Sequence, residues 1–149
     1  MSSLTVPKPS KLAKKKADPN SNYWRDRADE LWADLVRRRD GGCVICGDTR
    51  GINAHHLIDR SVKYLRHNLS NGVGLCPVHH KYSRACSAHA GMIAFVGWLN
   101  RWRPNQYAWA ATAAQEYLLH ERNKTIPGFN HQQDYEQLVQ YRDRTYPKC

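Results

Sequence analysis

CVICG at residues 43–47, AHHLIDR at 54–60 and NLSNGVGLCPVHHKYS at 68–83 are the stretches of the sequence that decide the fold. Cys43 and Cys46 form a C-x₂-C pair, and Cys76 and His79 form a C-x₂-H pair thirty residues further on. Sulfur and nitrogen ligands at such spacing close a tetrahedral zinc site, and Gly47 permits the tight turn of a zinc knuckle. We therefore predict a structural Zn²⁺ bound by Cys43, Cys46, Cys76 and His79.

A second C-x₂-H pair, Cys86 with His89, competes with Cys76 and His79 for this role. Cys76 follows a short apolar run and precedes a proline, a setting that fixes a ligand in place, whereas Cys86 lies among small residues. We therefore favour Cys76 and His79 as the zinc ligands and keep Cys86 and His89 as the alternative.

The charge of the chain points to a polyanionic partner. The 149 residues have a formal net charge of +10, from 23 Lys and Arg against 13 Asp and Glu, and the surplus is concentrated in residues 1–22 and 43–90. A basic surface attracts nucleic acid first and anionic membranes second. We therefore expect DNA as the partner and no membrane association.

Length and cysteine content suggest one domain in a reducing compartment. A chain of this length is most simply a single domain with tails. No stretch approaches the roughly 20 apolar residues of a membrane span, and the N-terminus lacks the apolar region of a signal peptide. We therefore expect a cytoplasmic protein in which the clustered cysteines are thiolate ligands rather than disulfides.

Composition and periodicity divide the chain into an arm and a domain. Residues 1–19 are rich in lysine and poor in apolar side chains, which predicts a disordered basic arm, and residues 20–149 are expected to fold. The domain has a core motif at 43–84 and a helical extension at 91–144. Apolar spacing predicts helices over 21–39, 91–122 with an interruption at Pro104, and 132–144. Short apolar pieces predict strands at 52–54 with 57–58 and at 72–75, and Pro77 is placed to begin a short helix.

The remaining histidines of the motif suggest hydrolytic chemistry. Hydrolysis of a phosphodiester needs a base to activate water and a cation to neutralise the phosphate and the leaving oxygen. His56 can be the base, because imidazole titrates near neutral pH, and His55 and His80 can bind the cation through neutral nitrogens. Adjacent residues of a strand point to opposite faces. A shared site for His55 and His56 therefore requires a twisted or irregular strand.

The pattern CVICG…AHHLIDR…NG…LCPVHHK resembles that of the HNH nucleases, in their zinc-stapled form, over residues 43 to about 84. The resemblance implies an α+β fold, with a ββα-metal (His-Me finger) motif and a zinc knuckle flanked by helices. It gives His56 the place of the general base, Asn71 that of the middle asparagine, and His80 that of a ligand of the catalytic metal. His55 stands where many members have Asp, and His79 where most have Cys.

The same resemblance implies a single catalytic divalent ion, often Mg²⁺ or Mn²⁺, and DNA cleavage that leaves 5′-phosphate and 3′-hydroxyl ends. The length and the basic arm resemble small HNH proteins encoded by bacteriophages, which implies a host-cytoplasmic enzyme with a second copy or other phage DNA-processing proteins as partners. Contacts to the DNA backbone are predicted for four basic residues, namely Arg60, Lys63, Arg66 and Lys81.

Two other classes of function stay open at this point. The chain could be a zinc-dependent DNA-binding module without catalysis, or an adaptor whose helical half binds a protein. Neither class needs His56, so a His56→Ala change separates both from a nuclease. His67 and His89 have no assigned role.

Overall fold

The computed structural model describes residues 10–147 and has an α+β architecture. Short helical turns η1 (Lys63–Leu65), η2 (Leu69–Asn71) and η3 (Val78–Tyr82) lie between or after the strands. The longer elements are α1 (Lys11–Ala17), α2 (Asn22–Asp40), β1 (Asn53–His56), β2 (Gly72–Leu75), α3 (Met92–Trp102), α4 (Pro104–Asn123) and α5 (His131–Thr145).

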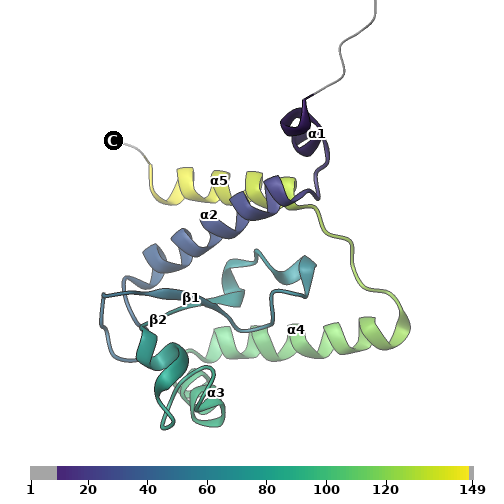
Figure 1. Ribbon diagram of the computed structural model, residues 1–149. Coiled ribbons are helices and arrows are strands. Elements are labelled where there is room, and N and C mark those ends of the chain that lie inside the picture. The colour runs from purple at the N-terminus through teal and green to yellow at the C-terminus, as the bar shows by residue number, and fades with distance from the viewer. Residues whose placement is uncertain (1–9, 148–149) are drawn as a thin grey trace, which may run out of the picture.

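A small antiparallel sheet of β1 and β2 lies at the centre (Figure 1). The register pairs His55 with Val73 and His56 with Gly72. Helix α2 covers one face of the sheet, and α3 and α4 lie on the other side (Figure 1). The strand predicted at 72–75 is confirmed, whereas the first strand ends at His56, because residues 57 and 58 turn away toward Asn71.

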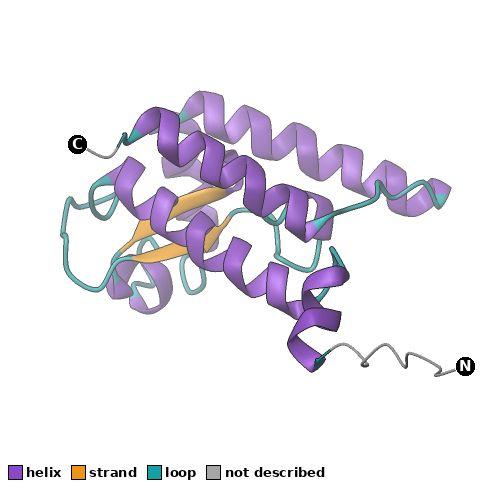
Figure 2. Ribbon diagram, turned by 90° about the horizontal axis from the view of Figure 1, so that it is seen from above, coloured by secondary structure: helices purple, strands orange, loops and turns teal. Residues whose placement is uncertain are grey.

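Helix α2 forms where the apolar spacing predicted it. Leu31 and Leu35 lie one turn apart on its buried face, and Gly41 ends the helix in the left-handed conformation at φ 67°. The outer flank of α2 packs against α5 around the buried Leu138, so that both helices lie over the sheet in the view from above (Figure 2). The helices predicted around Pro104 and over 132–144 are likewise present as α3, α4 and α5.

The basic arm is more ordered than predicted. Residues 11–17 form α1, so the expectation of disorder is wrong for this part, and residues 1–9 lie outside the described residues. Ser10 caps α1 by accepting a hydrogen bond from the N–H of Ala13 (3.1 Å), and lysine and alanine are good helix formers. The indole of Trp24 donates to the carbonyl of Lys16 (3.0 Å), which fastens α1 to α2.

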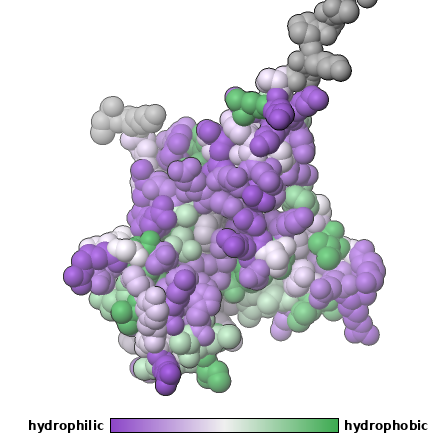
Figure 3. Space-filling model, in the orientation of Figure 1, coloured by the Kyte–Doolittle hydropathy of each residue, from purple (hydrophilic) through white to green (hydrophobic). Residues whose placement is uncertain are grey.

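The surface is mainly hydrophilic in the view of Figure 3, with hydrophobic side chains in small separate groups. The exposed hydrophobic residues include Ile93 and Trp102 of α3 and Leu118 of α4. Among residues 10–147, none of the helices combines the length and the apolar character needed to cross a membrane.

Candidate metal centre

The four predicted zinc ligands come together at one end of the sheet. The Sγ of Cys43 lies 3.6 Å from Nδ1 of His79, and the Sγ atoms of Cys46 and Cys76 are 3.8 Å apart. The Sγ of Cys76 is 3.3 Å from the same Nδ1. All four ligand atoms lie within 4.8 Å of one another. Three sulfurs and one nitrogen at these separations fit a tetrahedral zinc ion, and the competing pair of Cys86 and His89 is not part of this group.

The fold builds this cluster from two short segments. Gly47 adopts φ 76° and donates its N–H to the carbonyl of Cys43 (2.8 Å), which closes the knuckle. The N–H of Val44 donates to the carbonyl of Gly74 (3.0 Å), which fastens the knuckle to β2. Burial opposes ionisation of Cys43, but hydrogen bonds from backbone N–H groups outweigh it and lower the pKa of this thiol. A thiol that ionises readily is a ready zinc ligand.

A second cluster consists of three imidazoles. His55 comes from β1, His80 from η3, and His89 from the segment that follows η3. Their ring centroids are separated by 5.2 Å for His55 and His80, 5.1 Å for His55 and His89, and 4.9 Å for His80 and His89. One nitrogen of each ring lies within 4.8 Å of the others. His55 and His80 were predicted to share a cation, and the structure adds His89, whose sequence signal is only the C-x₂-H pair with Cys86.

The surroundings favour the neutral, metal-binding form of His55 and His80. Burial, together with the nearby charges of His80 and His89, lowers the pKa of His55 to about 4. Burial and His89 also lower the pKa of His80. The N–H of His89 donates to the carbonyl of His80 (3.2 Å), which holds the segment against η3. Neutral imidazole is the form that coordinates metals, so the rings of His55 and His80 can bind a cation at neutral pH.

His56 lies on the other face of β1. Its ring stacks on the indole of Trp32, with centroids 3.8 Å apart and planes inclined by 12°. Its Nε2 lies 2.9 Å from the carbonyl oxygen of Arg66. Since a carbonyl only accepts hydrogen bonds, Nε2 carries the proton and Nδ1 is left as the basic nitrogen. Burial lowers the pKa of His56. The regular alternation of β1 thus separates His56 from His55, and the expectation that both rings line one cavity is not met.

Asn71 is completely buried and closes the loop that follows β1. Its Oδ1 accepts from the N–H of Ile58 (2.7 Å), and its Nδ2 donates to the carbonyls of Ile58 (3.0 Å) and Leu65 (3.1 Å). Asn71 therefore holds the loop whose Arg66 carbonyl contacts His56. This asparagine has a structural environment and makes no contact with the three-imidazole cluster.

The four basic residues predicted to contact DNA have different surroundings. Arg60 and Lys81 are exposed. The ammonium group of Lys63 lies 4.8 Å from the ring centre of Phe129. Arg66 makes a two-pronged ion pair with Asp29, with both N–O distances at 2.6 Å. The guanidinium of Arg66 is thus committed to a contact inside the protein, and its environment does not favour a role at the DNA.

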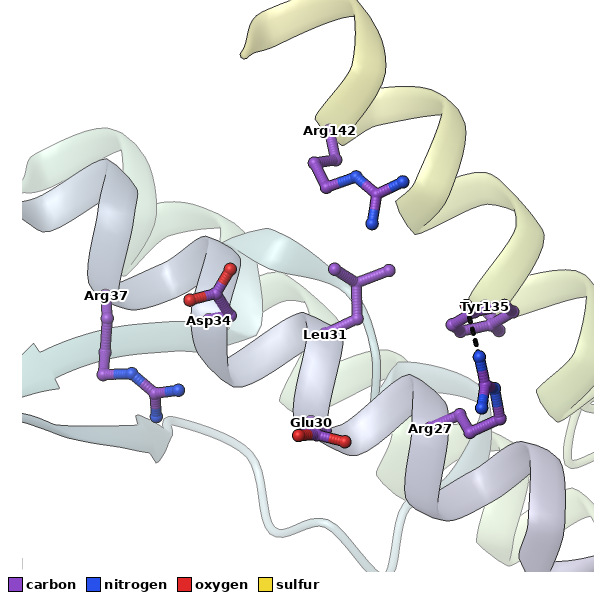
Figure 4. A pocket seen from close by; sticks show the side chains of 7 residues that line it. All are labelled: Arg27, Glu30, Leu31, Asp34, Arg37, Tyr135 and Arg142. Carbon is purple, nitrogen blue, oxygen red and sulfur yellow. Dashed lines mark hydrogen bonds between the residues drawn. The ribbon is translucent and has the colours of Figure 1, made fainter. Parts of the chain in front are cut away.

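Two cavities lie close to β1 and α2. One, of about 250 Å³, is bounded by His55 together with apolar residues of α3 and α4. The other, of about 310 Å³, lies between α2 and α5, where Arg27 donates to the hydroxyl of Tyr135 at 3.0 Å (Figure 4). Charges of both signs line the second cavity, and its lining contains no histidine or cysteine: Arg27, Glu30, Leu31, Asp34, Arg37, Tyr135 and Arg142. It is an interface between helices rather than a candidate reaction site.

The described residues thus include the cluster of Cys43, Cys46, Cys76 and His79, which fits a structural metal ion, and a separate cluster of three imidazoles that could hold a metal ion. His56 is held on the opposite face of β1 from the imidazole cluster. Comparisons of the chain with protein-family models, with curated proteins and with solved structures gave no match.

Proposed function

We propose that this chain is a metal-dependent endonuclease of the HNH type, which hydrolyses phosphodiester bonds of DNA. The observation that carries the proposal is the convergence of His55, His80 and His89 on one face of β1. On the opposite face of the same strand, His56 bonds the Arg66 carbonyl through Nε2, which leaves Nδ1 as its basic nitrogen. The resemblance in sequence over residues 43 to about 84 supports the same conclusion.

The donor set suggests which cation the cluster takes. Three imidazole nitrogens suit Zn²⁺ or Ni²⁺, whereas Mg²⁺ and Mn²⁺ prefer oxygen ligands. We therefore favour Zn²⁺ or Ni²⁺ over the Mg²⁺ or Mn²⁺ that the resemblance alone suggested. A bound ion would supply charge neutralisation at the phosphate and at the leaving oxygen. His89 is exposed, so the cluster is open to a substrate from outside.

His56 is the proposed general base. Its proton on Nε2 is fixed by the Arg66 carbonyl, so Nδ1 can take a proton from water. The two-stranded sheet leaves β1 with one edge unpaired by another strand among the described residues. A phosphate lying along that edge can be approached from both faces, since adjacent Cα atoms are only about 3.8 Å apart. We propose that the cation contacts the phosphate from the His55 face and that the activated water comes from the His56 face.

DNA is the proposed substrate because of charge. The net charge of +10 favours a polyanion, and exposed lysines in α1 add a basic segment next to the domain. Arg60 and Lys81, both exposed, are the best candidates for phosphate contacts among the residues predicted from sequence.

The test is nicking of supercoiled plasmid by the purified chain, with Mn²⁺, Ni²⁺, Co²⁺, Zn²⁺ or Mg²⁺ added. His56→Ala should lower the cleavage rate by about 100-fold or more, as expected for loss of a general base. His56→Phe keeps a ring on Trp32 and should be equally inactive. His120→Ala, which changes a histidine of α4 outside both clusters described above, should cleave normally.

The outcome separates the proposal from its rivals. A zinc-dependent binding module or an adaptor would show no metal-stimulated nicking in the wild type, with or without His56. Full activity in a folded His56→Phe variant would remove His56 from the mechanism. Circular dichroism and zinc content establish that each variant is folded.

A further inference from the structure

We propose that His67, His131 and Asp134 form an additional divalent-metal site, which joins the loop after β1 to the start of α5. The site is separate from both clusters described above and takes an ion of the zinc class. It does not depend on the proposed nuclease activity.

The three side chains converge in the protein interior. Nδ1 of His67 lies 2.8 Å from Oδ2 of Asp134, and Nδ1 of His131 lies 3.9 Å from the same oxygen. The two rings have centroids 5.3 Å apart, and one ligand atom from each of the three residues lies within 4.8 Å of the others. His67 is 6% exposed and His131 is 3% exposed. These separations resemble those among the four ligands of the cysteine-containing cluster.

A buried nitrogen of His131 that lacks a hydrogen-bond partner in the described part of the chain is the observation that indicates a bound ion. The Nδ1 of His131 is buried and has no hydrogen-bond partner among residues 10–147. Buried polar atoms are nearly always satisfied, and an orphaned one requires an explanation such as an ion. The backbone of His131 is held by its N–H, which donates to Oδ1 of Asn20 (3.2 Å). Its Nδ1 lies 3.9 Å from the carboxylate of Asp134, too far for a hydrogen bond.

Asp29 completes the arrangement expected around a metal-bound histidine. Such a histidine usually donates a hydrogen bond from its second ring N–H to a carboxylate, which fixes the ring orientation and makes the metal-binding nitrogen more basic. Nε2 of His67 lies 2.9 Å from Oδ1 of Asp29, and Arg66 holds Asp29 from the other side. His67 can thus bind an ion through Nδ1 while Nε2 stays bonded to Asp29.

A rival interpretation treats His67 as a cation held between Asp29 and Asp134 with no metal. That arrangement satisfies His67, but it leaves Nδ1 of His131 without a partner. An ion bound to both rings and to Asp134 satisfies all three groups. Two nitrogens and one carboxylate oxygen are a common ligand set for Zn²⁺, with water completing the tetrahedron. The ligands come from positions 64 residues apart in the chain (67 and 131), so the ion would cross-link distant segments.

The first test uses ¹⁵N NMR of the histidine rings in the full-length wild-type chain, freed of loosely bound metal and titrated with Zn²⁺. The proposal expects the Nδ1 resonances of both His67 and His131 to move on zinc addition, while Nε2 of His67 remains protonated. Unchanged Nδ1 resonances on both rings at saturating zinc would overturn it. This measurement needs no variant and so does not depend on a substitution that prevents folding.

The second test counts zinc per chain by elemental analysis. Asp134→Asn, which preserves shape, and His131→Ala should each lose one equivalent relative to wild type. Gln133→Ala, an exposed neighbour in the same turn of α5, should lose none. The same zinc content in wild type and in folded Asp134→Asn and His131→Ala variants would contradict the proposal. Plasmid cleavage is not a readout here, so failure of this site and failure of the nuclease proposal can be told apart.

Discussion

Replacement of Asn71 by alanine tests how the loop after β1 is held. The Asn71 side chain is completely buried and makes three hydrogen bonds, to the N–H and carbonyl of Ile58 and to the carbonyl of Leu65. Alanine removes all three and leaves the N–H and the carbonyl of Ile58 without these partners, whereas the Leu65 carbonyl still accepts from the N–H of Asn68 (3.2 Å). The backbone bond from the N–H of Leu57 to the carbonyl of Asn71 (2.8 Å) survives, so the strand end itself should persist.

The size of the effect follows from the two orphaned backbone groups of Ile58. A buried polar group that loses its partner costs about 1–3 kcal/mol. Water entering the space left by the side chain recovers part of this, so we expect the free energy of unfolding to fall by about 2–5 kcal/mol. Domains of this kind are stable by only about 5–15 kcal/mol, so the variant should lose a large share of its stability.

Urea unfolding at constant zinc, followed by circular dichroism, measures this change. Asn71→Asp keeps the shape but turns the two donated bonds into contacts between oxygens, so it should be at least as unstable as Asn71→Ala. Asn68→Ala is the matched control, because the exposed Asn68 side chain bonds only the N–H of Ser70 (2.9 Å) and its loss should cost about 0.5–2 kcal/mol. A loss below about 1 kcal/mol for Asn71→Ala, or equal losses at both asparagines, would refute the reasoning.

Three further changes test other parts of the structure. Gly72→Ala should destabilise by about 1–3 kcal/mol in thermal unfolding, because the added Cβ would lie 2.7 Å from the indole of Trp32, and an unchanged melting temperature would contradict this close packing. Asp40→Asn should cost about 2–4 kcal/mol near neutral pH, since its fully buried carboxylate pairs with two partly exposed arginines, one of them Arg103. Burial alone would raise the pKa of Asp40, but its hydrogen bonds lower it, so its contribution is present above the ordinary carboxyl pKa and is lost as the pH falls through the lowered value. The gap between wild type and variant in denaturant titrations should therefore shrink in acid, and a gap that widens would show the opposite shift. Cys46 is exposed, so Cys46→Ser should lower stability by several kcal/mol only if the thiol binds metal, and a chelator should then lower the melting temperature of wild type but hardly that of the variant.

The parts of the molecule that could be predicted are those with local signals. The zinc ligands are paired at short spacing, so Cys43 with Cys46 and Cys76 with His79 were recognisable before their segments met. Helix α2 and strand β2 follow from the spacing of apolar residues within each segment, which can be recognised without knowing which distant segments bury them. The α+β class was implied by the resemblance in sequence, and the observed elements agree with it.

The parts that could not be predicted depend on contacts between distant segments. The C-x₂-H pair of Cys86 and His89 has the same pattern as half of a zinc site, and only the backbone bond between His89 and His80 reveals that this histidine faces His55. His131 carries no sequence signal, because its partner His67 lies in another segment. Helix α1 was missed for a different reason, since lysine-rich composition suits both a disordered arm and a capped helix.

The orientation of His56 depends on Gly72, the first residue of β2. The register places Gly72 opposite His56, and a side chain at position 72 would collide with Trp32 and Val36. Because glycine leaves this space open, the indole of Trp32 can approach the sheet closely enough to stack on the imidazole. Trp32 also donates a hydrogen bond from its Nε1 to the carbonyl of Asn68 (2.9 Å). The indole on which the His56 ring stacks is therefore held by this bond as well as by its packing against Gly72. A free Nδ1 with a defined direction therefore requires the glycine, the tryptophan and the loop carbonyl together, and the pair of histidines alone does not determine it.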